Sequence, residues 1–247
     1  MTVKLAITGK SGSGKTTIVK AFMRLFREMF PEKSILLFDN DLSSELGHSF
    51  GLDIRNTIYG IRSGKHEYKT GIPEDMSKQE FIEWAMEDIV VTVDDNVDII
   101  VSWFVGSKDC RCPITKLIND AVDKLIHRYD IVIFDCEFDL KYLNQLVDTD
   151  VDTTLIVANP SEDSAHLAKR IEEFSMKYAA GNQIGVIINK VDNNLDEVYE
   201  LLHRYSLDIL GVIPFDKTIN SVNKDSKLVQ DAIRSFYFRL NLPQIKG

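Results

Sequence analysis

Cysteine is scarce in this sequence, with three residues among 247. So few cysteines exclude the disulfide framework on which small secreted proteins depend. The first residues, MTVKLAIT, have the pattern of a short strand and lack the apolar run of a signal peptide. These absences together predict a protein of the reducing cytoplasm.

Long hydrophobic runs and an excess of basic residues are also missing. No stretch approaches the ~20 apolar residues that a membrane-spanning helix needs. Lysine and arginine number 29 against 38 aspartate and glutamate, which gives a formal net charge of −9. Nucleic acids and anionic membranes attract basic surfaces, so this balance predicts neither as a partner. Hydrophobic residues make up 44% of the chain, enough for a sizeable buried core.

Short apolar runs alternate with longer amphipathic segments along most of the chain. Most of the runs are continuously apolar, which is typical of parallel strands covered on both faces. The predicted strands are at residues 4–8, 35–39, 98–104, 131–135, 154–158, 184–189 and 209–212. The predicted helices are at residues 16–29, 113–129, 161–178, 195–205 and 227–240. The alternation predicts an α/β fold with a doubly wound, mostly parallel sheet.

The segment 55–97 departs from this rhythm because it is polar. Within it, Ser77 and Glu80 have the spacing of a capping box at a helix start. We expect the segment to be an excursion beside the sheet, and residues 1–247 to form a single domain.

A glycine-rich loop lies between the first predicted strand and the first predicted helix. Its sequence, GKSGSGKTT, fits the phosphate-binding pattern G-x-x-x-x-G-K-[ST] in the expected strand–turn–helix context. Backbone N–H groups of such a loop and the following helix N-terminus attract phosphate. Lys15 is expected to reach the β- and γ-phosphates, and the Thr16 hydroxyl to bind Mg²⁺. The predicted nucleotide contacts here are Gly9, Ser11, Gly12, Ser13, Gly14, Lys15, Thr16 and Thr17.

Lys10, directly after the first glycine, marks a deviant form of this loop. In this respect the sequence resembles the MinD, ParA, ArsA and nitrogenase iron-protein ATPases. The resemblance implies a P-loop NTPase fold of the MinD/nitrogenase-iron-protein type, and a homodimer in which Lys10 reaches the nucleotide of the second subunit. Lys10 and Lys15 are therefore predicted catalytic residues, with ATP as the substrate.

Acidic residues end two of the predicted strands, where parallel strands open onto a ligand crevice. Asp135 closes the apolar run Ile131–Phe134, the form of a Walker B strand whose carboxylate binds Mg²⁺. Asp39 and Asp41 follow the second strand. By the same family resemblance, Asp41 is predicted to orient the attacking water and Asp39 to contact the hydrated Mg²⁺.

A base site is predicted at the ends of two later strands. Asn189 can present both a donor and an acceptor to a base edge, and Lys190 and Asp192 complete the string N-K-x-D. That string is also the guanine-reading motif of GTPases, so it supports base binding without deciding which base. Pro214 lies on a later strand and turn, where MinD-like proteins complete the base pocket.

Cys110 and Cys112 lie between a predicted strand and a predicted helix. Two thiolates are half of a tetrahedral four-cysteine site. Lys108, Arg111 and the helix N-terminus are expected to lower the thiol pKa values and so to favour metal binding. A two-fold axis would bring the same pair from a second chain, giving one Zn²⁺ or Ni²⁺ bridging two subunits.

Taken together, the motifs resemble those of the CooC-type ATPases, the maturation factors of carbon monoxide dehydrogenase. The resemblance spans nearly the whole chain, and C-x-C before a helix is its most specific element. It implies an ATP-dependent homodimer that binds nickel or zinc and helps to load nickel into a client enzyme. A homologous group serving acetyl-CoA synthase is not separated by these motifs.

Two positions depart from the family pattern, and other functions stay open. Ser11 replaces a glycine of the loop, and Asp139 stands where a glycine is expected to approach the γ-phosphate, which predicts slow hydrolysis. The alternatives are a MinD- or ParA-type positioning switch, an electron-transfer ATPase with a bridging cluster, and a GTPase that uses Asn189 and Asp192.

Overall fold

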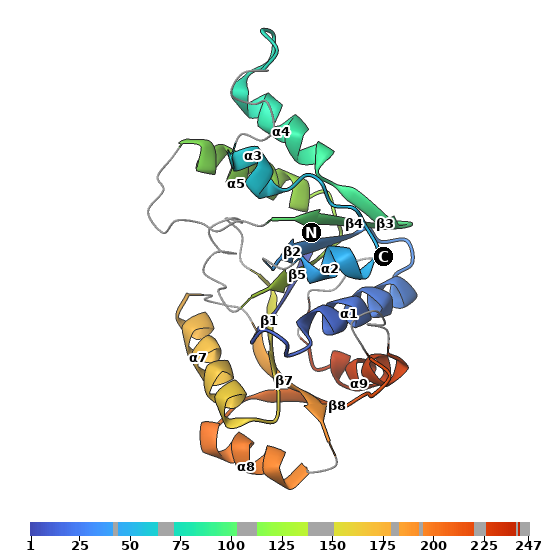
Figure 1. Ribbon diagram of the computed structural model, residues 1–247, viewed down its shortest axis with the longest axis vertical. Helices are drawn as coiled ribbons and strands as arrows, with labels where there is room; N and C mark the ends of the chain where they lie inside the picture. Colours follow the sequence, from blue (N-terminus) through green and yellow to red (C-terminus); the bar gives the residue numbers. More distant parts are fainter. Residues whose placement is uncertain are drawn as a thin grey trace.

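The computed structural model describes residues 1–41, 44–63, 72–102, 113–137, 151–178, 183–192, 195–219, 226–240 and 242. In this part of the chain, one sheet of eight strands has the order β3-β4-β2-β5-β1-β6-β7-β8 (Figure 1). The strands are β1 Val3–Gly9, β2 Ile35–Asn40, β3 Val91–Asp94, β4 Val97–Val101, β5 Ile131–Cys136, β6 Thr153–Ala158, β7 Gln183–Val191 and β8 Ile209–Pro214. Every neighbouring pair is parallel except β3 with β4, which is antiparallel.

Helices cover both faces of the sheet (Figure 1). Their bounds are α1 Lys15–Met29, α2 Glu45–Ser49, α3 Ile58–Ser63, α4 Lys78–Asp88, α5 Pro113–Ile126, α7 Glu162–Tyr178, α8 Leu195–Tyr205 and α9 Lys227–Tyr237. Side chains of α1, α2 and α9 join one apolar cluster, and side chains of α3, α4, α5, α7 and α8 join the other. The fold is therefore α/β and doubly wound, as predicted.

Alternation along the strands explains how one sheet serves two cores. On β2, Leu36 and Phe38 belong to one cluster while Ile35 and Leu37 belong to the other, and all four are fully buried. Successive side chains of a strand point to opposite faces, so a strand buried on both faces must be continuously apolar. Cys136, at the end of β5, is buried in the first of these clusters and packs there as a small side chain.

The segment 55–97 is less separate from the sheet than its polarity predicts. Strand β3 joins the sheet at its edge, and α3 and α4 bury apolar side chains, including Ile58 and Ile82, in the core. The capping box of α4 is confirmed, since the Ser77 hydroxyl accepts from the Glu80 N–H and the Glu80 carboxylate accepts from the Ser77 N–H.

Helix ends differ slightly from the sequence expectation. Helix α5 ends at Ile126 rather than at residue 129, and α9 ends at Tyr237 rather than at residue 240. Strand β4 is described as far as Val101, and the predicted continuation from 103 to 104 lies outside the described residues.

The sheet order brings the predicted site residues to one edge. Strand β1 lies between β5 and β6, so the loop after Gly9 emerges where the helix crossovers change direction. Ile7 and Asp39 are both register partners of Asp135, and Gly9 is the partner of Val157. In open α/β sheets, ligands bind at such a switch point, outside the carboxyl ends of the strands.

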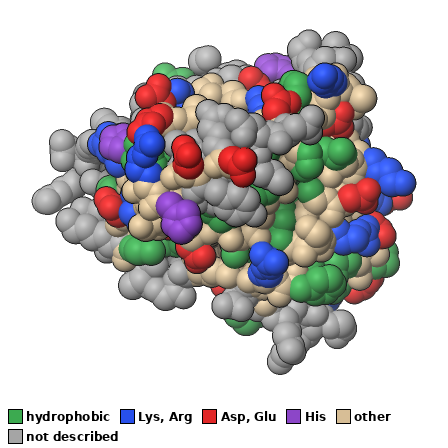
Figure 2. Space-filling view, turned by 90° about the horizontal axis from the view of Figure 1, so that it is seen from below, with side chains coloured by type: hydrophobic (Ala, Val, Ile, Leu, Met, Phe, Trp, Pro, Cys, Tyr) green, Lys and Arg blue, Asp and Glu red, His purple; other side chains and the backbone are tan. Residues whose placement is uncertain are grey.

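The described surface carries charges of both signs. In Figure 2 acidic and basic side chains are interspersed over the visible face, and the basic ones do not gather into a stripe. Within the described part of the chain, no helix has the length and apolar character to cross a bilayer.

Candidate nucleotide-binding site

The loop from Gly9 to Gly14 connects β1 to α1 and needs glycine at both ends. Gly9 has φ 147°, and a Cβ there would lie 2.2 Å from the Val157 carbonyl oxygen. Gly14 has φ 101°, and a Cβ there would lie 2.3 Å from Nδ2 of Asn189. Other residues rarely adopt this left-handed backbone, and a side chain would push the loop away from β6 and β7.

Two side chains of β7 hold the carbonyl groups of this loop. Nδ2 of Asn189 donates to the Ser13 carbonyl oxygen at 2.8 Å, and Nζ of Lys190 donates to the Gly12 carbonyl oxygen at 2.7 Å. Lys190 itself has φ 60°, an uncommon backbone for a residue with a side chain. The two contacts fix the loop against β7.

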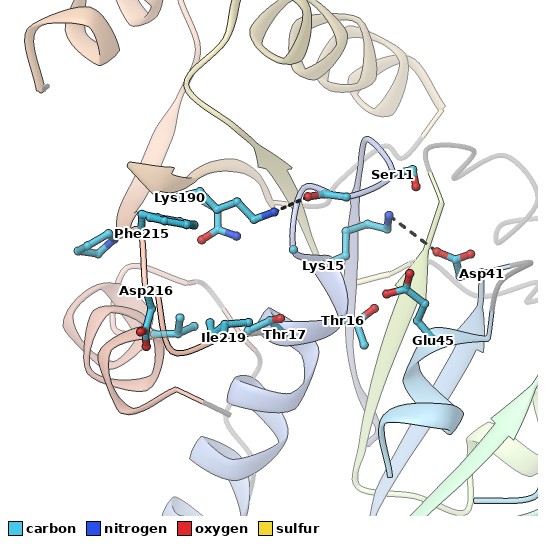
Figure 3. A pocket seen from close by; sticks show the side chains of 15 residues that line it. Ser11, Lys15, Thr16, Thr17, Asp41, Glu45, Lys190, Phe215, Asp216 and Ile219 are labelled. Atoms are coloured by element: carbon cyan, nitrogen blue, oxygen red, sulfur yellow. Dashed lines mark hydrogen bonds and ion pairs between the residues drawn. The ribbon is translucent and has the colours of Figure 1, made fainter. Parts of the chain in front are cut away.

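A cavity of about 330 Å³ opens beside the loop. Figure 3 shows that its lining side chains form two groups. Lys15, Thr16, Asp41 and Glu45 lie at one end, which we call the phosphate end. Lys190, Phe215, Asp216 and Ile219 lie at the other end, which we call the base end, and the cavity lining also includes Asn189, Pro214 and Val229.

At the phosphate end, Lys15 is buried and turned toward an acid. Its Nζ lies 3.9 Å from Oδ2 of Asp41 and 3.5 Å from the carbonyl oxygen of Lys10, to which it donates. The Lys15 side chain is only 4% exposed. Asp41 and the Lys15 ammonium therefore face each other at this end of the pocket (Figure 3).

Thr16 and Asp135 form the part of the site that fits Mg²⁺. The Thr16 hydroxyl donates to Oδ2 of Asp135 at 2.9 Å, while the buried Oδ1 has no hydrogen-bond partner in the described part of the chain. Burial raises the pKa of Asp135 to about 6, although the nearby Lys15 opposes the shift. A divalent cation would satisfy the orphaned oxygen and hold the carboxylate in its charged form.

Protein groups supply only part of the coordination that a cation needs. The described residues contain no group of three or more His, Cys, Asp or Glu side chains placed to hold a metal ion. Mg²⁺ usually takes its other ligands from water and substrate phosphates, so Thr16 and Asp135 suit a cation that arrives with a nucleotide.

The Asp39 carboxylate accepts two backbone hydrogen bonds beyond the end of β2. Its Oδ1 accepts from the Asp41 N–H at 3.1 Å, and its Oδ2 accepts from the Gly47 N–H at 3.3 Å. Burial and the neighbouring Asp135 raise the pKa of Asp39 to about 7. In this conformation Asp39 organises the turn into α2, which carries Asp41 and Glu45 to the pocket.

The base end is more apolar than the phosphate end. Pro214, Phe215, Ile219 and Val229 face the cavity, and the Phe215 side chain is 44% exposed at its rim. Aromatic and aliphatic side chains of this kind are typical of a slot for a flat heterocycle. Asn189 and Lys190 also line the cavity and add polar groups to it.

Several pocket residues were missed by the sequence analysis. Glu45, Ile219 and Val229 come from α2, from the turn after β8 and from α9, and none belongs to a recognised motif. Their only sequence signal was proximity to predicted site residues, because Glu45 follows Asp41 and Ile219 follows Pro214.

Other predicted residues lie outside the pocket lining. Ser13 is buried beneath the loop, and Lys10 is exposed on its outer side. Asp192, the last residue of the N-K-x-D string, is exposed and does not line the cavity. Cys110, Cys112 and Asp139 lie outside the described residues.

The site combines a glycine-rich loop at the switch point, a lysine and a carboxylate–threonine pair. This combination resembles the site of a known domain family. The family described as the CobQ/CobB/MinD/ParA nucleotide binding domain matches residues 4–229. The chain belongs to this family. It is thus a P-loop, MinD-like nucleotide-binding protein, in a family whose members are generally ATPases.

Relatives with similar sequences are found in archaea and bacteria. An uncharacterized ATP-binding protein of Methanocaldococcus jannaschii is 29% identical and aligns over 97% of this chain and 98% of its own. The carbon monoxide dehydrogenase accessory protein CooC of Rhodospirillum rubrum is 25% identical, over 90% of this chain and 87% of its own. CooC is therefore one distant relative among ATP-binding proteins of this family.

Solved structures confirm the fold. The MinD cell division protein of Aquifex aeolicus superposes with a TM-score of 0.67 at 19% identity, covering 98% of this chain and 99% of its own. Cobyrinic acid a,c-diamide synthase of Mycobacterium smegmatis, with bound ADP and magnesium, also gives a TM-score of 0.67 at 19% identity, covering 96% of this chain and 92% of its own.

Proposed function

We propose that this chain is a single-domain ATPase that binds Mg-ATP in the pocket and works as a homodimer in assembling a nickel enzyme. The observation that carries the ATPase part is the pairing at the phosphate end of Lys15 with Asp41 and of Thr16 with Asp135. This pairing would give the cavity a cation for the phosphates and a carboxylate for the attacking water, and the buried, unsatisfied Asp135 oxygen beside Thr16 supports Mg²⁺ binding.

Each residue has a definite part in hydrolysis under this proposal. Lys15 leaves Asp41 and binds the β- and γ-phosphates, while the loop amides from Gly9 to Thr17 surround the remaining oxygens. Asp41, released from the lysine, accepts a hydrogen bond from the attacking water and orients it toward the γ-phosphate. Thr16 and Asp135 would hold Mg²⁺, which supplies charge neutralisation at the phosphates.

The base end supports adenine over guanine. GTPases read guanine with the carboxylate of the N-K-x-D string, and here Asp192 does not line the cavity. At the base end, the Asp216 carboxylate already accepts from the Thr218 N–H and hydroxyl and from the Ser226 hydroxyl. The apolar surfaces of Phe215 and Ile219 would contact either base equally, so the lack of a free carboxylate among the described residues of the base end favours ATP.

The nickel role rests on sequence and on the relatives. Cys110 and Cys112 give each chain two soft ligands, and a second chain would complete a tetrahedral Zn²⁺ site or a flatter Ni²⁺ site. CooC of Rhodospirillum rubrum, by its name, serves carbon monoxide dehydrogenase. We infer that a nickel enzyme of this or a related kind is the client, and that Lys10 acts on the ATP of the partner subunit.

Nucleotide binding and light scattering on three proteins test the ATPase proposal. Wild type should bind ATP more tightly than GTP, dimerise with a slowly hydrolysed ATP analogue and hydrolyse ATP. Lys15→Ala should lose most nucleotide affinity, whereas Lys10→Ala should bind ATP but neither dimerise nor hydrolyse it. Equal or stronger binding of GTP would overturn the adenine assignment, and an unchanged dimer in Lys10→Ala would remove the role in trans.

A further inference from the structure

The base end of the pocket is assembled from separate pieces of chain. Phe215 follows strand β8, Ile219 belongs to the turn after it, and Val229 lies in the first turn of α9. In Figure 3 Phe215, Asp216 and Ile219 group together at the end of the pocket away from Lys15. The shape of this end therefore depends on whatever ties the pieces to one another.

Asp216 is the residue to which all these pieces are connected. Its Oδ1 accepts from the N–H and the hydroxyl of Thr218, at 2.8 and 2.7 Å, and its Oδ2 accepts from the Ser226 hydroxyl at 2.5 Å. The Asp216 carbonyl oxygen also accepts from the Ile219 N–H at 3.3 Å. One side chain thus joins the end of β8, the turn at 217–219 and the residue that begins α9.

Ser226 passes this connection to the helix. It is the N-cap of α9, and its side-chain oxygen accepts from the Val229 N–H at 3.0 Å. Ser226 and Val229 are both buried. Ile219 and Val229 are the two aliphatic residues of the base end. The Ile219 N–H is bound by Asp216 itself, and the Val229 N–H is bound by Ser226, which in turn donates to Asp216.

We propose that Asp216 is the positioning residue of the base end, where its carboxylate clasps Thr218 and Ser226 and so shapes an apolar slot selective for adenine. The inference rests on the proposed ATP-binding function. Because Oδ1 already has two donors, the carboxylate cannot offer both oxygens to the paired N–H groups of guanine. The hydrogen bonds of Asp216 order the slot. At the same time they occupy the carboxylate oxygens that would otherwise accept from guanine.

The hydrogen bonds also keep the clasp charged. The donors from Ser226 and Thr218 hold the pKa of Asp216 below its usual range. A charged acceptor binds hydroxyl and amide donors more strongly than a neutral one. The clasp is therefore expected to persist across the pH range in which nucleotides bind.

Calorimetric titration with ATP, ADP, GTP and inorganic tripolyphosphate, all with Mg²⁺, separates the two ends of the pocket. Asp216→Ala should weaken ATP and ADP binding roughly tenfold, the effect of losing a few charge-assisted hydrogen bonds and the slot they order. Tripolyphosphate has no base, so its affinity should stay within about twofold of wild type. The preference for ATP over GTP should shrink toward equality.

Three further variants separate a local effect on the base end from a general loss of folding. Ser226→Ala should reproduce the loss for ATP, and Ser226→Thr, which keeps the hydroxyl, should restore most of it. Asp231→Asn removes a charge from the exposed side of α9, outside the pocket lining, and should bind all four ligands like wild type.

The outcomes are distinct for the two proposals. Wild-type protein that does not bind ATP would overturn the proposed function itself. Wild type that binds ATP, with Asp216→Ala keeping its ATP affinity and its preference over GTP, would overturn the clasp alone. An equal loss of ATP and tripolyphosphate in Asp216→Ala would likewise overturn it, because it would show general damage to the fold.

Discussion

Asp41 lies beside Lys15, the lysine that binds the phosphates in the proposed function. A nearly buried lysine with one carboxylate 3.9 Å away has to exchange that partner when a triphosphate binds. The same carboxylate then becomes available for the attacking water. Binding and hydrolysis should therefore respond in opposite directions when Asp41 loses its charge.

Asp41→Asn is expected to bind ATP roughly fivefold more tightly, because a partly exposed ion pair worth up to ~1 kcal/mol no longer competes with the phosphates. Hydrolysis should fall about 100-fold, the usual contribution of a positioned base. Glu45→Gln, which removes an acid from the same end of the pocket, is the control and should tighten binding while keeping most of the turnover. Weaker ATP binding in Asp41→Asn would contradict the competition.

Asp39 gives a prediction for stability against pH. Its pKa is about 7 in the folded chain against an ordinary value of 3.8. The folded state therefore binds more protons between these two values, so this residue's contribution to the free energy of unfolding falls as pH rises from about 4 through 7. In the absence of Mg²⁺ and nucleotide, thermal unfolding should show this decline.

The variant Asp39→Asn serves as the comparison, because it cannot titrate. The melting temperature of wild type, relative to that of this variant, should fall as pH increases from 5 to 8. A parallel pair of curves over that range would show that Asp39 does not carry the effect.

At the scale of elements, strand β7 supports the phosphate loop. The Asn189 amide donates to the Ser13 carbonyl oxygen and lies against Gly14. Asn189→Ala should therefore weaken ATP and tripolyphosphate alike, by about fivefold, since a net hydrogen bond is worth ~1 kcal/mol. Loss of ATP affinity with tripolyphosphate unchanged would instead assign Asn189 to the base alone.

Helix α4 offers a test of local stability away from the pocket. Its capping box joins Ser77 and Glu80, and losing an N-cap side chain costs about 1 kcal/mol. Ser77→Ala should lower the melting temperature by roughly 2–4 °C in a chain of this size. Ser235→Ala, at an exposed position on α9, should change it less, and ATP affinity should be unchanged in both variants.

The elements show which features a sequence can predict. Helix α8 was predicted with the bounds observed, because its apolar residues recur at helical spacing. Strand β3 was missed, because four residues in a polar segment, alternately exposed and partly buried, give too short a pattern to separate from a loop. It exists because the edge of the sheet at β4 offers it backbone partners, which depends on the tertiary fold.

The site residues likewise divide into those that the sequence identifies and those that depend on the tertiary fold. The loop from Gly9 to Thr17, Asp41 and Asp135 were identifiable because each follows a strand and has a chemically specific residue type. Glu45 and Val229 could not be identified, since their places in the pocket depend on how α2 and α9 pack. The clasp of Asp216 on Ser226 joins residues ten positions apart, across a helix start that no motif marks.

At the scale of the whole molecule, the central claim is that ATP and a metal ion meet at the axis of a homodimer. The described part of the chain contains the nucleotide pocket, and Lys10 is exposed on its loop. In this proposal Lys10 reaches toward a second subunit. In the same proposal, Cys110 and Cys112 supply half of a four-thiolate site. If both ligands need the same dimer, each must raise the affinity of the other.

Native mass spectrometry of the zinc- or nickel-loaded protein, with and without a slowly hydrolysed ATP analogue, tests this claim most directly. Wild type should carry one metal ion per two chains, more fully with nucleotide, and Cys110→Ser/Cys112→Ser should lose the metal while still binding ATP. One metal ion per chain, or metal retained without these two cysteines, would contradict the bridging site and the nickel-handling role built on it.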